Sequence, residues 1–119
     1  MSTKLTDAEL KVMDVLWEEG ELTAVQLAKV MNARIGWVRN TTYTIAKKLV
    51  EKGAVDRHDP GFVCRAAVSR ESVQREEAAE LIDKLFDGSA ELFLSAYVSG
   101  KKLSSDEIDG LRRIVEELK

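Results

Sequence analysis

Residues 37–66 begin with Trp37-Val38-Arg39-Asn40-Thr41-Thr42-Tyr43-Thr44-Ile45-Ala46-Lys47-Lys48-Leu49, continue through Lys52-Gly53-Ala54-Val55, and turn at Asp59-Pro60-Gly61. The first part has helical spacing, with apolar side chains on one face and hydroxyl, amide and basic side chains on the other. Gly53 suits the position after a helix, where a positive φ is needed. In the turn, proline fixes φ and glycine permits a positive φ. The segment predicts a helix over 39–52 and strands over 54–58 and 62–66.

Two further helices are predicted before this segment. Thr6 and Glu9 have the spacing of a capping box, in which each satisfies an exposed N–H group of the other. The first helix ends at Gly20, and Thr23 with Gln26 repeats the same logic for a second, shorter helix. Three helices followed by a ribbon predict a winged helix-turn-helix domain over residues 1–68.

The last fifty residues predict three amphipathic helices, which begin near Ser69, Glu91 and Ser104. The fold class is therefore mainly α with a small antiparallel β-ribbon. Isolated helices gain stability mainly from packing, so these helices need a partner surface. They could fold back on the winged helix, but we expect residues 69–119 to form a helical dimerisation region. The expected dimer contacts are Leu81, Leu85, Phe86, Leu92, Phe93, Tyr97, Ile108, Leu111, Ile114 and Val115.

Composition and charge limit the classes of function. The chain has 119 residues and a net charge of −3, and 45% of its residues are apolar. It contains no apolar run long enough for a membrane span and no leader-like segment, so we expect a soluble, cytoplasmic protein. From residue 29 to 57 there are seven basic and two acidic residues, whereas residues 69–119 contain eight basic and twelve acidic ones. The distribution places a basic patch on the predicted winged helix and an acidic balance on the rest.

The outer face of the 39–52 helix has the chemistry of a DNA-reading helix. Arginine pairs with guanine, asparagine pairs with adenine, and the threonine methyl packs on the thymine methyl. The expected base-reading residues are Arg39, Asn40, Thr41 and Thr44. The expected contacts to the DNA backbone are Thr23, Gln26, Trp37, Tyr43, Lys47, Lys48, Lys52, Arg57 and Arg65. The alternative is a solvated helix face that binds nothing.

Four single residues allow two interpretations each. Trp37 packs in the core or contacts the DNA backbone, and Tyr43 either reaches the backbone or is a surface residue. His58 is a polar residue near the hairpin turn rather than a metal ligand, because one histidine and one cysteine are too few for a closed zinc site. Cys64 packs inward from a strand or senses oxidation. We find no motif for a metal, a cofactor or a catalytic nucleophile, so no cofactor is expected and an enzyme is disfavoured.

The quoted motifs together resemble the penicillinase-repressor (BlaI/MecI) family, which also includes the copper-responsive CopY repressors. The similarity covers nearly the whole chain. Residues 5–17 are similar to the opening helix of the family. The family's recognition helix and its end are similar to Trp37, Thr41, Thr44 and Leu49 followed by Lys52-Gly53-Ala54-Val55. Residues 87–89 and 103–108 are similar to its dimerisation part. The resemblance implies a homodimeric repressor that binds an inverted-repeat operator, with a sensor protease as a further partner.

Two departures from the family pattern concern regulation. The copper branch carries a Cys-x-Cys motif near its C-terminus, which this chain lacks. The penicillinase branch is cleaved at an Asn-Phe bond in the short helix after the break, where this chain has Ala96-Tyr97. The leading hypothesis is thus a homodimeric repressor that contacts double-stranded DNA through residues 39–52. The alternative is a winged-helix adaptor that binds other proteins and not DNA.

Overall fold

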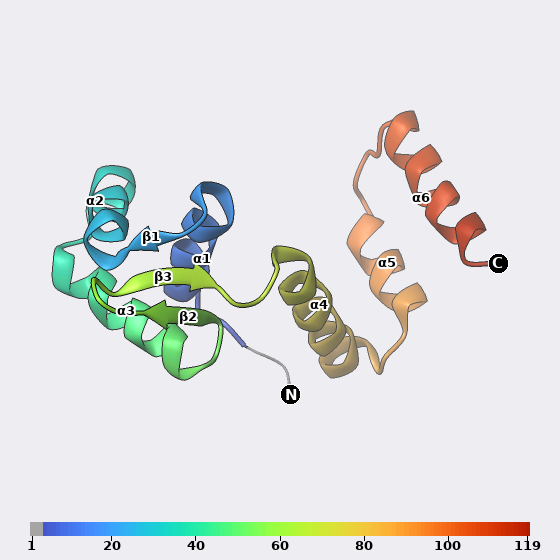
Figure 1. The fold of residues 1–119 in the computed structure, drawn as a ribbon. Helices are drawn as coiled ribbons and strands as arrows, with labels where there is room; N and C mark the ends of the chain where they lie inside the picture. The colour runs from blue at the N-terminus through green and yellow to red at the C-terminus, as the bar shows by residue number, and fades with distance from the viewer. Residues whose placement is uncertain (1–3) are drawn as a thin grey trace. The chain divides into compact units, whose positions relative to one another are not determined.

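The computed structural model describes residues 4–119, and these form two compact units (Figure 1). The first unit ends at Ala78 and the second comprises Ala79–Lys119. The elements in chain order are α1 (Asp7–Glu19), β1 (Leu22–Thr23), α2 (Ala24–Ile35), α3 (Arg39–Glu51), β2 (Val55–His58), β3 (Val63–Ala66), α4 (Arg70–Phe86), α5 (Ala90–Val98) and α6 (Ser105–Glu117). The division lies within α4 and not at the expected residue 68, because Val73 in the first turn of α4 joins the core of the first unit.

Local sequence signals set the ends of the helices. Capping boxes form at Thr6, Thr23 and Ser104, where each hydroxyl accepts the N–H of the residue three positions later at 3.1 Å. At the end of α3, Gly53 has φ +80°, as predicted. The Ala54 N–H donates to the Leu49 carbonyl at 3.0 Å, and the Gly53 N–H donates to the Val50 carbonyl. These two bonds form a Schellman motif, which ends the helix sharply and sends the chain into β2.

The sheet has three antiparallel strands in the order β1-β3-β2, with β3 in the middle (Figure 1). The hairpin β2–β3 agrees with the sequence prediction, and its register pairs Val55 with Ala66. The strand β1 was not predicted, because two residues are too few to show strand periodicity. Leu22 of β1 pairs with Cys64. The Ala24 N–H also donates to the Phe62 carbonyl at 2.9 Å, so the tip of the hairpin is joined to the start of α2.

The core of the first unit lies between the three helices and the sheet. Its most buried apolar side chains come from every one of these elements and include Val12, Met13, Leu27, Met31, Leu49 and Cys64. Trp17 at the end of α1 donates its indole N–H to the Val68 carbonyl at 2.9 Å. The Arg70 guanidinium lies 5.3 Å from the centre of the Trp17 ring and pairs with Asp14. These contacts join the start of α4 to α1.

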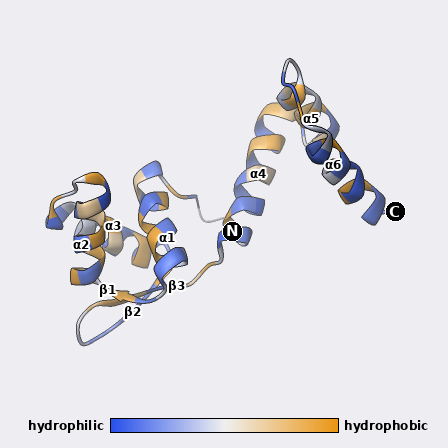
Figure 2. Ribbon diagram, turned by 90° about the horizontal axis from the view of Figure 1, so that it is seen from above, coloured by the Kyte–Doolittle hydropathy of each residue, from blue (hydrophilic) through white to orange (hydrophobic). Residues whose placement is uncertain are grey.

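The second unit carries apolar side chains that it does not bury. The α4 segment next to α5 is coloured hydrophobic and the opposite end of α4 hydrophilic in Figure 2. The rings of Phe86 and Phe93 meet edge to face at 5.5 Å, and Phe93 stacks on Tyr97 at 6.0 Å. Neither α5 nor α6 has a buried residue. In the part of the chain that the structure describes, no helix has both the length and the apolar character needed to cross a membrane.

Candidate nucleic-acid interface

The two faces of α3 differ sharply in their surroundings. Thr42, Ala46 and Leu49 are spaced by four and three residues and are buried against α1, α2 and the sheet. The opposite face is exposed and consists of Asn40, Thr41, Thr44, Lys47 and Lys48, and Arg39 is exposed at the start of the helix, on the side toward α2. The helix therefore presents hydroxyl and amide groups near its start and cations near its end, as the sequence predicts.

The basic residues of the predicted patch and of the hairpin fall into two groups, and the structure distinguishes them by their partners. Within residues 4–119, no carboxylate forms an ion pair with Arg39, Lys47 or Lys48. Lys29 on α2 is likewise exposed and without an ion pair in this range. We name these four residues the unpaired cations. Their charges are available to an external anion such as a DNA phosphate.

The expected cations of the wing belong to the paired group. Arg65 on β3 pairs with Asp56 on β2 at 3.2 Å, and the Arg57 Nε lies 3.2 Å from an Asp59 carboxylate oxygen. The Arg57 guanidinium also covers the ring of Phe62, 3.7 Å from its centroid. Two arginines and two aspartates thus leave the hairpin with no net charge from these side chains. The sequence shows the two arginines but not which carboxylates lie beside them.

Lys52 differs most from its expected role. Its ammonium donates to Glu9 Oε1 at 2.6 Å and to the Lys4 carbonyl at 2.9 Å, both at the start of α1. The predicted contact of Lys52 with a phosphate stays untested. In this structure, however, the ammonium is held within the protein, unlike the ammonium groups of Lys47 and Lys48.

The start of α2 offers fewer free groups than expected and one group that was missed. The Thr23 hydroxyl oxygen and the Gln26 side-chain oxygen accept each other's backbone N–H groups, so the Thr23 O–H and the Gln26 side-chain NH₂ remain as side-chain donors. Between α2 and the start of α3 lies a hollow of about 280 Å³, lined by Val25, Ala28, Lys29, Asn32 and Arg39. Lys29 was counted in the basic patch but not assigned a contact, because it precedes the helix that sequence reasoning emphasised.

Val38 is a second residue that sequence reasoning missed. It is the N-cap of α3, and the helix has no side-chain cap there. Its side chain is 66% exposed, although valine is apolar and a poor N-cap. The start of α3 therefore combines backbone N–H groups that lack a side-chain cap with an exposed pair of methyl groups. The only signal in the sequence was the absence of Ser, Thr, Asp or Asn at that position.

The residues with two interpretations are placed as follows. Trp37 packs partly buried against the core, and its carbonyl accepts the side-chain N–H of Asn32 at 3.0 Å. Tyr43 is partly exposed on α3, and His58 is exposed at the end of β2. Cys64 is fully buried on β3, and burial raises the pKa of its thiol to about 11, although the charge of Arg57 acts to lower it. At neutral pH it therefore stays in the less reactive thiol form.

Known proteins share this sequence over most of its length. The sequence profile of the penicillinase repressor family matches residues 5–117. The penicillinase repressor of Bacillus licheniformis is 25% identical over 118 residues, which cover 98% of this chain and 92% of that protein. The methicillin resistance regulatory protein MecI of Mammaliicoccus sciuri is 24% identical over 116 residues, which cover 96% of this chain and 94% of that protein.

Solved structures match the first part of the chain. The solution structure of the DNA-binding domain of the repressor BlaI has a TM-score of 0.55 and 28% identity, and covers 60% of this chain and 93% of that one. Bacillus licheniformis BlaI in its monomeric form, in complex with the blaP half-operator, has a TM-score of 0.52 and 28% identity, with coverage of 58% and 87%. The winged-helix prediction is confirmed by this likeness. Because a single family profile spans nearly the whole chain, the protein belongs to the penicillinase repressor family, whose members are repressors and not enzymes.

Proposed function

We propose that this chain is a transcriptional repressor that binds operator DNA through the exposed face of α3. The observation that carries the proposal is the combination, on one face of one helix, of exposed Asn40, Thr41 and Thr44 with cations that have no partner in the described chain. A related structure, BlaI with the blaP half-operator, is of a protein in complex with DNA, and it shares this fold at 28% identity. A major groove accommodates such a helix.

The proposed roles divide the face into two parts. Near the start of α3, Arg39 suits guanine, Asn40 suits adenine, and the methyl groups of Thr41 and Thr44 suit the thymine methyl. Lys47 and Lys48 lie farther along and suit phosphate. Lys29 extends the same cationic surface from α2. Lys52, Arg57 and Arg65 are paired with carboxylates, which weakens their attraction for a phosphate.

Selection of bound sites from random duplex DNA tests the proposal directly. We expect the chain to enrich a defined sequence, which we call the selected duplex, with an affinity that falls about 10³–10⁵-fold between about 50 and 200 mM salt if roughly 6–10 phosphates are contacted. A chain that enriches no sequence and binds no random duplex at low salt contradicts the proposal. That result would favour the protein-interaction adaptor.

Thr44→Ala tests base reading by α3. The substitution removes an exposed methyl and hydroxyl in the middle of the reading face while alanine preserves the helix. We expect weaker binding to the selected duplex and nearly unchanged binding to random duplex. Ser105→Ala on α6, in the second unit, serves as the control, because it also removes one exposed hydroxyl but from outside the first unit. Equal losses on the two duplexes would remove Thr44 from the base-reading set.

We further propose that the second unit joins two copies of the chain, so that two α3 helices face an inverted repeat. Leu85 on α4 is 63% exposed and Ile114 on α6 is 58% exposed. Between α5 and α6 lies an apolar hollow of about 310 Å³, whose lining includes Leu94, Tyr97 and Leu111. Exposed apolar surface of this kind is typical of an interface. Burying one aliphatic side chain stabilises by about 1.5–3 kcal/mol, so several of them can exceed the cost of association.

Leu85→Glu tests the dimer, with Lys84→Glu as a control that adds a carboxylate to the neighbouring exposed position. Sedimentation equilibrium at micromolar concentration should give a dimer for the wild type and for the control, and a monomer for Leu85→Glu. The monomeric variant should bind one half of a selected inverted repeat as the wild type does and lose affinity for the whole repeat. A wild-type monomer would overturn the dimer and leave the role of α3 intact.

Location and regulation complete the proposal. A repressor works where its operator is, so we assign the cytoplasm as its location.

A sensor protease stays a proposed partner. Ala96 and Tyr97 are exposed, but both lie within α5, so cleavage of the bond between them requires this helix to open. Intact-mass analysis of the chain from cells exposed to a cell-wall antibiotic would detect such cleavage.

A further inference from the structure

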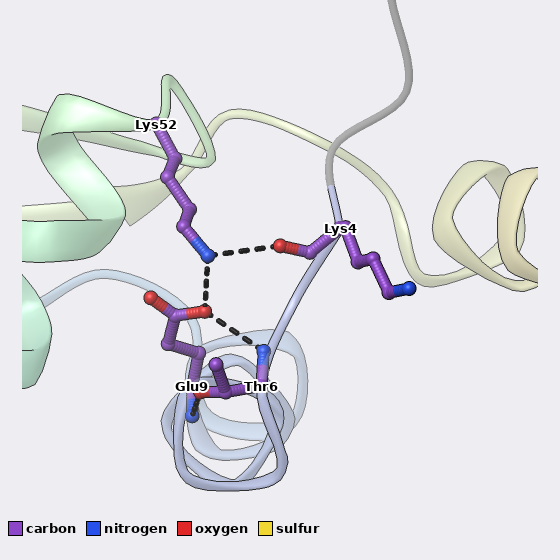
Figure 3. Close-up of polar contacts among 4 residues, drawn as sticks. All are labelled: Lys4, Thr6, Glu9 and Lys52. Atoms are coloured by element: carbon purple, nitrogen blue, oxygen red, sulfur yellow. Dashed lines mark hydrogen bonds and ion pairs between the residues drawn. The ribbon is translucent and has the colours of Figure 1, made fainter.

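A partly buried ion pair joins the beginning of α1 to the end of α3. Figure 3 shows the Lys52 ammonium between two oxygen atoms, Glu9 Oε1 at 2.6 Å and the Lys4 carbonyl at 2.9 Å. The same Glu9 oxygen accepts the Thr6 N–H at 2.8 Å. The Glu9 side chain is 2% exposed and the Lys52 side chain is 37% exposed. The pair therefore joins two residues that are 43 positions apart in the sequence, and its carboxylate is almost completely buried.

The charges of the pair suit the helix ends on which they lie. Glu9 is in the first turn of α1, where the helix dipole favours a negative charge, and Lys52 is the C-cap of α3, where it favours a positive one. Burial acts to raise the pKa of Glu9, but the hydrogen bonds from Lys52 and Thr6 outweigh it and hold the pKa below its ordinary value. Glu9 is thus ionised at neutral pH, and the pair is a charge-assisted hydrogen bond.

The remaining contacts of α3 are less directional. Its inner face packs through Ala46 and Leu49, and apolar contacts of this kind leave a helix some freedom to slide or rotate. The start of α3 lacks a side-chain cap. A hydrogen bond requires a narrow range of distance and angle. Because a helix of 13 residues is a stiff rod of about 20 Å, a contact that restricts the movement of its last turn also restricts the movement of its first turn.

We propose that Glu9 and Lys52 are positioning residues, which hold the end of α3 against the first turn of α1 and so set how Asn40, Thr41 and Thr44 meet the bases. This proposal rests on the proposed function. It assigns Lys52 a role within the protein in place of the phosphate contact that its sequence position suggested. It also gives Glu9 a role beyond closing the capping box of α1.

Lys52→Met tests the proposal, because methionine keeps a straight apolar stem and removes the ammonium. The matched control is Lys48→Met on the same helix, which removes an unpaired cation. For Lys52→Met we expect the preference for the selected duplex over random duplex to fall about tenfold, with the slope of log affinity against log salt unchanged. For Lys48→Met we expect both duplexes to be bound more weakly and the slope to decrease by about 1.

Two further variants separate positioning from folding. Lys52→Arg keeps a cation and should retain most of the preference for the selected duplex over random duplex. Glu9→Gln should lose this preference, although its side-chain oxygen still accepts the Thr6 N–H. If the two residues act as one unit, the double variant Glu9→Gln/Lys52→Met loses no more preference than either single variant. All binding is measured well below the melting temperature of each variant, with helicity checked by circular dichroism. A variant that melts earlier but keeps its full preference overturns the proposal.

The slope of log affinity against log salt distinguishes a positioning role of Lys52 from a phosphate contact. If Lys52→Met lowers the salt slope as Lys48→Met does, then Lys52 contacts a phosphate and the positioning role is wrong. A measurement without DNA provides an independent test: amide hydrogen exchange in residues 6–10 and 47–53 should accelerate together in Lys52→Met. Unchanged exchange at either end overturns the proposal. A wild-type chain that selects no duplex overturns the proposed function instead, and exchange still tests the coupling of the two helix ends.

Discussion

Asp56 and Arg65 face each other across the β2–β3 hairpin, and their side chains form an ion pair of 3.2 Å. The next residue along β2, Arg57, is paired with Asp59 near the turn. The hairpin of a winged helix is often regarded as a cationic arm, but here each of these arginines has a carboxylate beside it. Both pairs are partly exposed, so each contributes little to stability, and each lowers the positive potential available to a phosphate.

Removing one of these carboxylates should strengthen binding to DNA. Asp56→Asn keeps the shape of the side chain and frees the charge of Arg65. We expect tighter binding to random duplex at about 50 mM salt and a salt slope that steepens by up to about 1. Filter binding or fluorescence anisotropy over a salt series measures both. Asp109→Asn on α6 makes the same change in the second unit, and it should leave both quantities unchanged. If Asp56→Asn also changes neither, the wing does not approach the phosphates.

Val38→Ser should raise stability and reduce specificity. Serine at the N-cap of α3 accepts an exposed backbone N–H, which stabilises by about 1 kcal/mol, while it removes the exposed methyl groups beside Arg39. We therefore expect a higher denaturation midpoint and a lower preference for the selected duplex. Val38→Ala is the control, because it removes the methyl groups without adding a cap. Tighter binding of Val38→Ser to the selected duplex would show that Val38 does not touch a base.

Thr42→Val should stabilise the first unit. The Thr42 hydroxyl oxygen is buried and has no hydrogen-bond partner among residues 4–119. Leaving a polar atom in this state costs about 1–3 kcal/mol, and valine replaces the hydroxyl with a methyl of similar size. We expect the free energy of unfolding in urea to rise by about 1 kcal/mol. Thr42→Ser keeps the hydroxyl, loses the methyl and should destabilise. A destabilised valine variant would mean that a water molecule satisfies the hydroxyl.

Acid should unfold the protein partly through Glu9. Its pKa in the folded state lies below the ordinary value of 4.5, so folding favours the ionised form. The resulting stabilisation is complete above pH 4.5 and is lost as the pH falls from there through the lower, folded-state pKa. Between about pH 6 and about pH 3, the urea midpoint of the wild type should therefore fall more than that of Glu9→Gln. Parallel curves would show that other carboxylates cause the acid sensitivity.

The helices could be located from the sequence because their signals are local. Thr6, Thr23 and Ser104 each form a capping box with a residue three positions away, and Gly53 adopts the positive φ that ends α3. Such signals depend only on neighbouring residues, so they can be recognised in the sequence without knowledge of the fold. The inward position of Leu49 and the outward position of Lys48 follow from helical periodicity for the same reason.

Only the tertiary structure decided which charges remain available. Lys48 and Lys52 are both lysines at the end of one basic helix, but only Lys52 lies next to Glu9, a residue 43 positions away. The pairing of Arg65 with Asp56 depends on hairpin register, and the two-residue strand β1 exists only because β3 offers it an edge. Ion pairs and strand pairs join groups that chain folding brings together, and sequence spacing carries little information about them. The sequence alone therefore determined the helices and the basic patch, and the tertiary contacts determined which of its cations face outward unpaired.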